Sequence, residues 1–147
     1  MTIHVLVGLP GSGKTEWAKR FRRDNGGIIL SKDIIRREMF GVEFDPDLER
    51  DVYNIFQNMY TSALCGSIEN IIIDNTNLTM YIRDHIKRRG VESIIAHVFN
   101  CKPYTAWKRK KASGSRMNLG DFSRLVALYE PVSNEEGFTA VLIHDAN

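Results

Sequence analysis

Apolar residues form two kinds of pattern along this chain. Short runs of consecutive apolar, often β-branched residues are typical of buried strands, whereas apolar residues three and four positions apart indicate amphipathic helices. The strand-like runs are 3–7, 28–30, 70–73, 93–99 and 138–143. The helical patterns cover about 14–23, 31–39, 47–64, 79–90, 103–112 and 122–129. Strands that alternate with helices predict one parallel sheet covered by helices on both faces.

The helical spacing also predicts which side chains pack on the sheet. The expected inward residues of the first four helices are Trp17, Ala18 and Phe21; Ile34, Ile35 and Met39; Leu48, Val52, Ile55, Phe56, Met59 and Ala63; and Ile82 and Ile86. The fourth helix is expected to begin at Thr79 and to end at Gly90. The chain thus has enough apolar positions for one core.

The loop between the first strand and the first helix carries a chemical signature. Residues 8–15 read Gly-Leu-Pro-Gly-Ser-Gly-Lys-Thr, which fits the phosphate-loop pattern. In that loop the backbone amides and the helix N-terminus face phosphate oxygens. Lys14 would reach the β- and γ-phosphates, and the Thr15 hydroxyl would bind Mg²⁺. The candidate nucleotide-binding residues are Gly8, Pro10, Gly11, Ser12, Gly13, Lys14 and Thr15. A glycine-rich turn that binds nothing is disfavoured, because both the spacing and the flanking elements fit.

Acidic residues follow the second and third strands. Asp74 ends a β-branched run, where a phosphate-loop protein places a carboxylate near Mg²⁺. Asn75, Thr76 and Asn77 follow it as polar residues of the same crevice. Asp33 falls in the first turn of a helix that Ser31 would cap, so the helix dipole favours its ionised form.

Arg36 lies three residues after Asp33, on a neighbouring helix surface. An acidic residue that pairs with an arginine at a helix start is common in structural roles. The position gives this pair a second interpretation, because the carboxyl ends of strands face the ligand crevice of an α/β sheet.

The segment from 102 to 124 is strongly basic and contains one acidic residue, Asp121. Its basic residues are Lys102, Lys108, Arg109, Lys110, Lys111, Arg116 and Arg124. Two interpretations stay open: a solvated basic surface, or a mobile lid over about 103–120 that covers ATP and supplies an arginine to the γ-phosphate.

Composition narrows the class of protein. With 147 residues, 43% hydrophobic and 26% charged, the chain fits a single globular domain over 1–147. A net charge of +2 does not by itself imply a nucleic-acid partner. Cys65 and Cys101 are too few for a disulfide framework or a zinc site, so we expect reduced thiols in a cytoplasmic protein. No segment predicts a membrane span or a signal peptide, and no feature indicates an oligomeric state.

Five acidic residues cluster before and at the start of the third helix. They are Glu43, Asp45, Asp47, Glu49 and Asp51. We interpret them as solvated side chains favoured by the helix dipole rather than as metal ligands.

Four segments together resemble the kinase domain of phage-type polynucleotide 5′-kinases. They are Gly8–Thr15, Ser31–Asp33 with Arg36, Ile71–Leu78, and the basic lid. More widely, the chain is similar to the small phosphate-loop kinases related to zeta toxins and gluconate kinases. The resemblance covers nearly the whole chain, including a tail from Pro131 to Phe138, and it implies a five-stranded sheet in the order 2-3-1-4-5. The phosphate loop by itself specifies only nucleotide binding.

The resemblance implies roles for the site residues. Asp33 would activate the attacking 5′-hydroxyl, and Arg36 would hold the adjacent phosphate of a DNA or RNA acceptor. Lys14 and Thr15 would hold ATP, or another nucleoside triphosphate, with Mg²⁺. The lid arginine would be Arg116, with Arg109 as the other candidate. Asn75, Thr76 and Asn77 would contribute to the acceptor site, and Asp74 to the metal.

The chain departs from the phage pattern in three respects. An acidic residue precedes Thr-Asn-Leu in the phage enzyme, whereas Asn75 stands there in this chain and the acid is Asp74. The lid is longer, which leaves the choice between Arg109 and Arg116 open. No phosphatase or ligase domain accompanies the kinase, so a partner in nucleic-acid repair would be a separate chain.

We therefore expect an ATP-dependent kinase that phosphorylates 5′-hydroxyl ends. A kinase of a small molecule, such as a nucleoside or sugar, keeps the phosphate loop and differs in the acceptor site. A non-catalytic nucleotide switch is less favoured, because it needs no base such as Asp33 for an alcohol. No row of aromatic residues predicts a long single-strand groove, so contacts to a few terminal nucleotides are expected.

Overall fold

The computed structural model describes residues 1–147 and contains one five-stranded sheet. The strands are β1 (Thr2–Val7), β2 (Ile28–Leu30), β3 (Asn70–Ile73), β4 (Ser93–Asn100) and β5 (Ala140–Asp145). All four pairings are parallel, and the spatial order is β2-β3-β1-β4-β5. Both the fold class and the strand order predicted from the sequence are confirmed.

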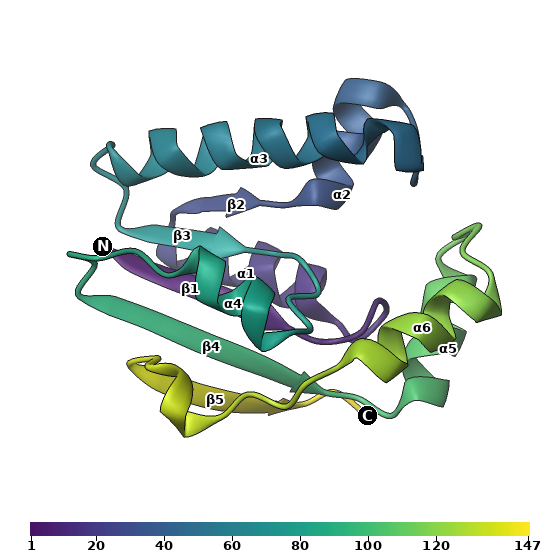
Figure 1. Cartoon of the computed structure of the whole chain (residues 1–147). Coiled ribbons are helices and arrows are strands. Elements are labelled where there is room, and N and C mark those ends of the chain that lie inside the picture. The colour runs from purple at the N-terminus through teal and green to yellow at the C-terminus, as the bar shows by residue number, and fades with distance from the viewer.

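Helices cover both faces of this sheet (Figure 1). They are α1 (Lys14–Asn25), α2 (Lys32–Ile35), α3 (Glu49–Leu64), α4 (Met80–Ile86), α5 (Pro103–Ala112) and α6 (Leu119–Leu128). Single turns of π- or 3₁₀-helix are η1 (Arg36–Phe40), η2 (Pro46–Leu48) and η3 (Asn134–Glu136). Helices α3 and α4 pack on one face and α1 on the other, while α5 and α6 lie beyond the carboxyl edge.

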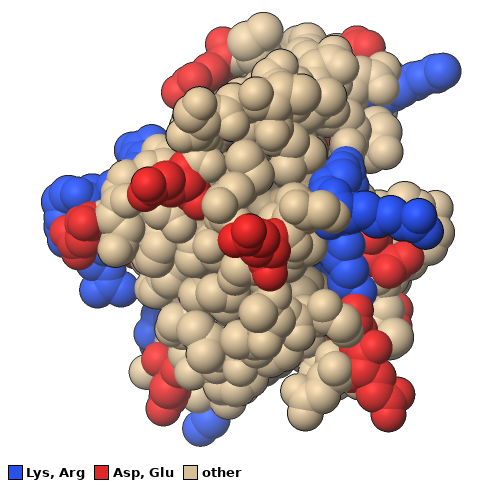
Figure 2. Space-filling model, turned by 90° about the vertical axis from the view of Figure 1, so that its left-hand side faces the viewer, with Lys and Arg blue, Asp and Glu red and all other residues tan.

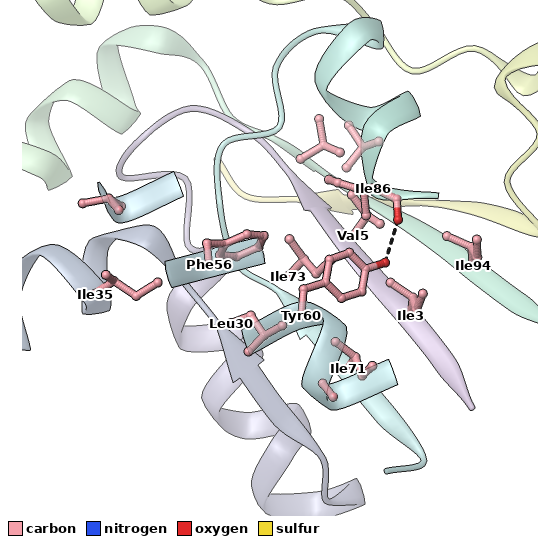
Figure 3. Packing of buried hydrophobic residues seen from close by; sticks show 14 residues of the cluster. Ile3, Val5, Leu30, Ile35, Phe56, Tyr60, Ile71, Ile73, Ile86 and Ile94 are labelled. Carbon is pink, nitrogen blue, oxygen red and sulfur yellow. Dashed lines mark hydrogen bonds between the residues drawn. The ribbon is translucent and has the colours of Figure 1, made fainter. Parts of the chain in front are cut away.

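The main core lies between the sheet and helices α3 and α4 (Figure 3). Alternate residues of β1 and β3 point into it, because successive strand residues face opposite sides of a sheet. The phenol of Tyr60 is fully buried and donates a hydrogen bond of 2.6 Å to the carbonyl of Ile86. This bond satisfies the polar end of an otherwise apolar ring and ties α3 to the end of α4.

The opposite face carries a row of histidines beneath α1. His4 Nδ1 lies 3.0 Å from His97 Nε2, and His97 Nδ1 lies 2.9 Å from His144 Nε2. Trp17 and Phe21 cover the row, with ring centroids 4.4 Å from His97 and 4.5 Å from His4. Burial lowers the pKa of His97 to about 3 and also lowers the pKa of His4 and His144. The folded protein therefore holds these rings neutral.

This histidine row predicts acid-sensitive stability. Near pH 5.5 the unfolded chain protonates its histidines, whereas folded His97 stays neutral, so the free energy of unfolding falls as the pH drops below about 6.5. His97 alone should lower the free energy of unfolding by about 1 kcal/mol at pH 5.5 relative to neutral pH. Urea unfolding at the two pH values measures the difference. Replacing exposed His85 by glutamine should leave it unchanged, and equal stability at both pH values would contradict the prediction.

One buried ion pair joins α4 to the segment before β5. The Arg83 side chain is fully buried and pairs with Glu136 at 2.8 and 3.0 Å. It also donates to the carbonyl of Asn77 at 3.0 Å. Burial would raise the pKa of Glu136, but hydrogen bonds from Arg83 and from the amide of Ser133 keep that pKa below its usual value. The pair thus connects the segment that follows β3 to the chain that follows α6.

The structure corrects four local predictions. Met39, Met59 and Ile82 are 63%, 42% and 44% exposed, although all three were expected to pack inward. The turn Arg36–Phe40 is a π-helix, so the register of α2 shifts before it reaches Met39. In α4 the inward position belongs to Arg83, and the helix ends at Ile86 rather than Gly90.

Figure 2 shows the face at the amino ends of the strands, opposite the phosphate loop. Uncharged side chains dominate the centre of this view, and basic side chains gather at its two sides. A cavity of 360 Å³ opens here between Met1, Leu64 and the turn 88–92. This cavity therefore lies at the end of the sheet opposite the phosphate loop. No helix of the protein is long and apolar enough to cross a membrane.

Candidate active site

The phosphate loop connects β1 to α1 in a conformation that glycine makes possible. Gly11 and Gly13 have φ angles of 85° and 96°, a region that side chains rarely adopt. A Cβ on Gly11 would lie 2.1 Å from the carbonyl oxygen of Ala106 in α5, so this position also needs glycine for space. No backbone hydrogen bond uses the amides of Gly11 or Gly13. These amides and the N-terminus of α1 form a donor set that suits a phosphate group.

Lys14 is buried at the base of this loop. Its ammonium donates to the carbonyls of Gly8 and Leu9 at 3.0 and 2.8 Å. Burial lowers the Lys14 pKa to about 8, although Asp74 and Asp33 act in the opposite direction. An anion that approaches such a lysine stabilises its charged form. The carboxylates of both predicted acidic site residues therefore share the electrostatic environment of Lys14.

Thr15 and Asp74 meet across 59 residues of sequence. The Thr15 hydroxyl donates to Asp74 Oδ2 at 2.8 Å. Burial raises the pKa of Asp74, while Lys14 and Thr15 oppose that effect. Mg²⁺ binds hard oxygen ligands and takes one or two carboxylates together with substrate phosphates, so this pair fits it. No group of three or more His, Cys, Asp or Glu side chains stands ready to hold a metal unaided.

Asp33 lies in the first turn of α2, just after the carboxyl end of β2, and Arg36 directly follows α2 as the first residue of η1. The Ser31 side chain caps this helix by accepting the amide of Ile34. Arg36 Nη1 donates to Asp33 Oδ1 at 2.6 Å, and its Nε and Nη2 donate to the carboxylate of Glu49 at 2.8 and 2.6 Å. The Asp33 side chain is 72% exposed, whereas that of Arg36 is 14% exposed. A mostly buried arginine thus holds an exposed carboxylate in place.

The three polar residues after Asp74 connect parts of the protein to one another. The Asn75 side chain accepts the amide of Lys32 at 2.9 Å, and the Asn77 side chain donates to the carbonyl of Leu6 at 2.6 Å. The carbonyl of Thr76 accepts the amide of Gly8 at 3.0 Å. Asn77 is 2% exposed and has a φ angle of 47°. These contacts connect the segment after β3 to α2, to β1 and to the phosphate loop. A role of the three residues in acceptor binding stays a prediction.

The basic segment forms α5, a loop, and α6 beside the phosphate loop, beyond the carboxyl ends of the strands (Figure 1). Two predicted lid residues differ in their contacts. The Arg109 guanidinium donates to the carbonyl of Ala146, at the end of β5. Arg116 lies in the loop between the helices, where only its backbone amide is bonded, to Glu43 Oε2 at 2.8 Å. The Arg116 side chain forms no ion pair and is exposed.

Two acidic residues have contacts that the sequence did not reveal. Glu49 and Glu43 were interpreted as solvated, but Glu49 pairs with Arg36, and Glu43 accepts the Ser115 hydroxyl together with the Arg116 amide. Burial would raise the pKa of Glu43, but hydrogen bonds from Ser115 and Arg116, together with the charges of Lys110 and Lys111, keep that pKa below its usual value. In the sequence, the only indication of the Glu43 contact was that one segment is acidic and the other is basic.

Comparisons with known proteins agree with this architecture. The AAA domain family matches residues 3–114, and that range includes every candidate active-site residue except Arg116. NEDD4-binding protein 2 from Homo sapiens is 31% identical over 125 residues, which cover 84% of this chain. They cover 7% of that protein, so this chain corresponds to a small part of its length.

Solved structures with the same fold include kinases. A chain of the Pnkp1/Rnl/Hen1 RNA repair complex superposes with a TM-score of 0.70 and 19% identity, covering 94% of this chain and 50% of that chain. A gluconokinase from Sinorhizobium meliloti 1021 superposes with a TM-score of 0.66 and 16% identity, covering 99% of this chain and 82% of that chain. At these identities the likeness is one of fold.

Proposed function

Because this chain belongs to the AAA domain family and has a P-loop kinase-like fold, we propose that it transfers the γ-phosphoryl group of ATP to the 5′-hydroxyl end of a DNA or RNA strand. The observation that carries the proposal is Asp33, an exposed carboxylate held by Arg36 within the electrostatic reach of Lys14. An alcohol is a poor nucleophile at neutral pH, so a carboxylate beside it assists the attack.

The donor side of the reaction follows from the phosphate loop. The loop amides and Lys14 would hold the β- and γ-phosphates of ATP or another nucleoside triphosphate, and Thr15 with Asp74 would hold Mg²⁺. The cation would neutralise charge on the phosphates. The protein's own part is to orient the phosphoryl group toward Asp33, which would accept the proton of the attacking hydroxyl.

Arg36 supports a nucleotide acceptor. Three of its five N–H groups engage Asp33 and Glu49, which leaves one on each terminal nitrogen for a phosphate. In a strand end, such a phosphate lies one nucleoside away from the reacting 5′-hydroxyl. The relative from the RNA repair complex agrees with a nucleic-acid acceptor.

One observation favours a small acceptor that carries no phosphate instead. Arg36 faces two carboxylates, so the group of three carries a net negative charge that opposes an incoming phosphate. The gluconokinase among the structural relatives makes a sugar or a nucleoside the second candidate.

The decisive experiment offers four acceptors with ATP and Mg²⁺: a 5′-hydroxyl oligonucleotide, a 3′-phosphorylated nucleoside, a plain nucleoside and gluconate. We expect the first two to be phosphorylated fastest, and Arg36→Ala to weaken those two selectively. Arg37→Ala, an exposed neighbour on the same turn, is the matched control. Gluconate or the plain nucleoside as the best acceptor would replace this proposal by the small-molecule kinase.

The lid arginines give a separate prediction. Arg116→Ala should lower kcat at least about tenfold with a smaller change in the KM for ATP, since a lid arginine with no other partner would be available to stabilise charge that develops in the transition state. Arg109→Ala should have the smaller effect on kcat, because Arg109 is bonded to Ala146. Steady-state kinetics with varied ATP measure both. A larger loss of kcat in Arg109→Ala would reverse the assignment.

A further inference from the structure

An aromatic side chain stands exposed beside the candidate base. Phe44, in the segment 41–45 between η1 and η2, is 61% exposed. The centre of its ring lies 5.7 Å from the guanidinium carbon of Arg36, and that guanidinium is bonded to Asp33. One face or edge of the ring therefore covers the arginine, and most of the rest is open to solvent.

The segment that carries Phe44 is anchored on both sides. Glu43 binds the Ser115 hydroxyl and the Arg116 amide of the loop between α5 and α6. Asp45 caps η2 by accepting the amide of Asp47 at 3.0 Å. A ring on an anchored segment loses less backbone entropy when a ligand packs on it, which favours binding.

We propose that Phe44 is the stacking platform for the terminal nucleobase of the acceptor, and that it selects base-bearing acceptors over sugars. This inference rests on the proposed function. Every nucleobase has a π-face, and stacking on an aromatic side chain is the usual way to hold an unpaired base without reading its sequence. A hydroxyl-rich sugar gains little from such a ring.

Charge and position support this occupant over a protein partner. The ring lies against Arg36, which holds Asp33, the residue that would meet the 5′-hydroxyl. Its neighbour Glu43 contacts the loop between α5 and α6, and Lys110 and Lys111 act electrostatically on Glu43. Basic side chains on that side complement the phosphates of a strand. A single platform also agrees with contacts to only a few terminal nucleotides.

The test compares two oligonucleotides of the same sequence, one with a normal 5′-terminal nucleoside and one with a tetrahydrofuran abasic residue there. Wild-type protein should prefer the normal end at least about tenfold in kcat/KM, the scale of one stacked base. Phe44→Ala and Phe44→Leu should reduce that preference to near unity by slowing the normal end, whereas Phe44→Trp should retain it. The KM for ATP should not change in any of them.

Tyr81→Ala is the matched control, because Tyr81 is a 73% exposed aromatic residue on α4, outside the proposed site. It should keep the wild-type preference. A Phe44→Ala protein that retains the preference, or that slows both oligonucleotides equally, would overturn the inference. Equal wild-type rates on the two oligonucleotides would overturn it too, while leaving the 5′-kinase intact; phosphorylation of gluconate alone would remove the proposed function itself.

Discussion

Replacing Lys14 by alanine should lower phosphoryl transfer about 10³-fold, the upper range for removing one preorganised donor from charge that develops in a transition state. Lys14 lies at the base of the phosphate loop, and its low pKa shows that burial already disfavours its charge. A bound triphosphate would supply the missing counter-charge. We therefore expect the loss in both kcat and ATP affinity.

The measurement is ATP consumption coupled to each acceptor, with circular dichroism to verify the fold. The matched control is Lys19→Ala, an exposed lysine on the same helix, which should keep wild-type rates. Lys14 packs against loop carbonyls and not within an apolar cluster, so its removal should leave the sheet folded. A folded Lys14→Ala protein with undiminished transfer would exclude the role assigned to Lys14 and to the phosphate loop.

Replacing Asp33 by asparagine should lower transfer about 10²-fold or more while ATP affinity stays close to wild type, as expected for the loss of a general base. Asparagine keeps the shape and accepts a hydrogen bond from Arg36, but it cannot take a proton. The effect should therefore appear in kcat for every acceptor. Single-turnover kinetics with saturating ATP isolate this step.

Asp51→Asn is the control for the loss of a carboxylate at a helix start, since Asp51 is exposed in the first turn of α3. It should leave turnover unchanged. If Asp33→Asn kept wild-type kcat, Asp33 would have only the structural role of a partner to Arg36. Asp74 would then be the remaining acidic candidate near the phosphates.

The features that the sequence predicted well depend on local pattern. The phosphate loop, the Ser31 cap and the strand runs each follow from residues a few positions apart, and the structure has all three. The Thr15–Asp74 contact spans 59 residues, and the sequence had assigned both residues to one site, because parallel strands bring their carboxyl ends to one edge. The parallel topology of the sheet thus brings together residues that are distant in the sequence.

Contacts between side chains of different elements were not predictable in the same way. Glu43 and Arg116 are separated by 73 residues, and neither strand order nor periodicity determines where the two loops meet. The inward position in α4 went to Arg83 instead of Ile82, because a buried carboxylate from η3 compensates its charge. Burial of a charged residue depends on a partner, and hydrophobic periodicity carries no information about that partner.

The buried pair of Arg83 and Glu136 sets a lower limit on the piece of chain that folds independently. The family match ends at residue 114, before the residue that neutralises Arg83. A fragment cut there would bury an uncompensated guanidinium, at a cost of about 3–5 kcal/mol, and would leave β4 as an unprotected sheet edge. The evolutionary module and the thermodynamic unit therefore differ in length, and a proteolytic fragment of this protein should survive only if it keeps the chain through β5.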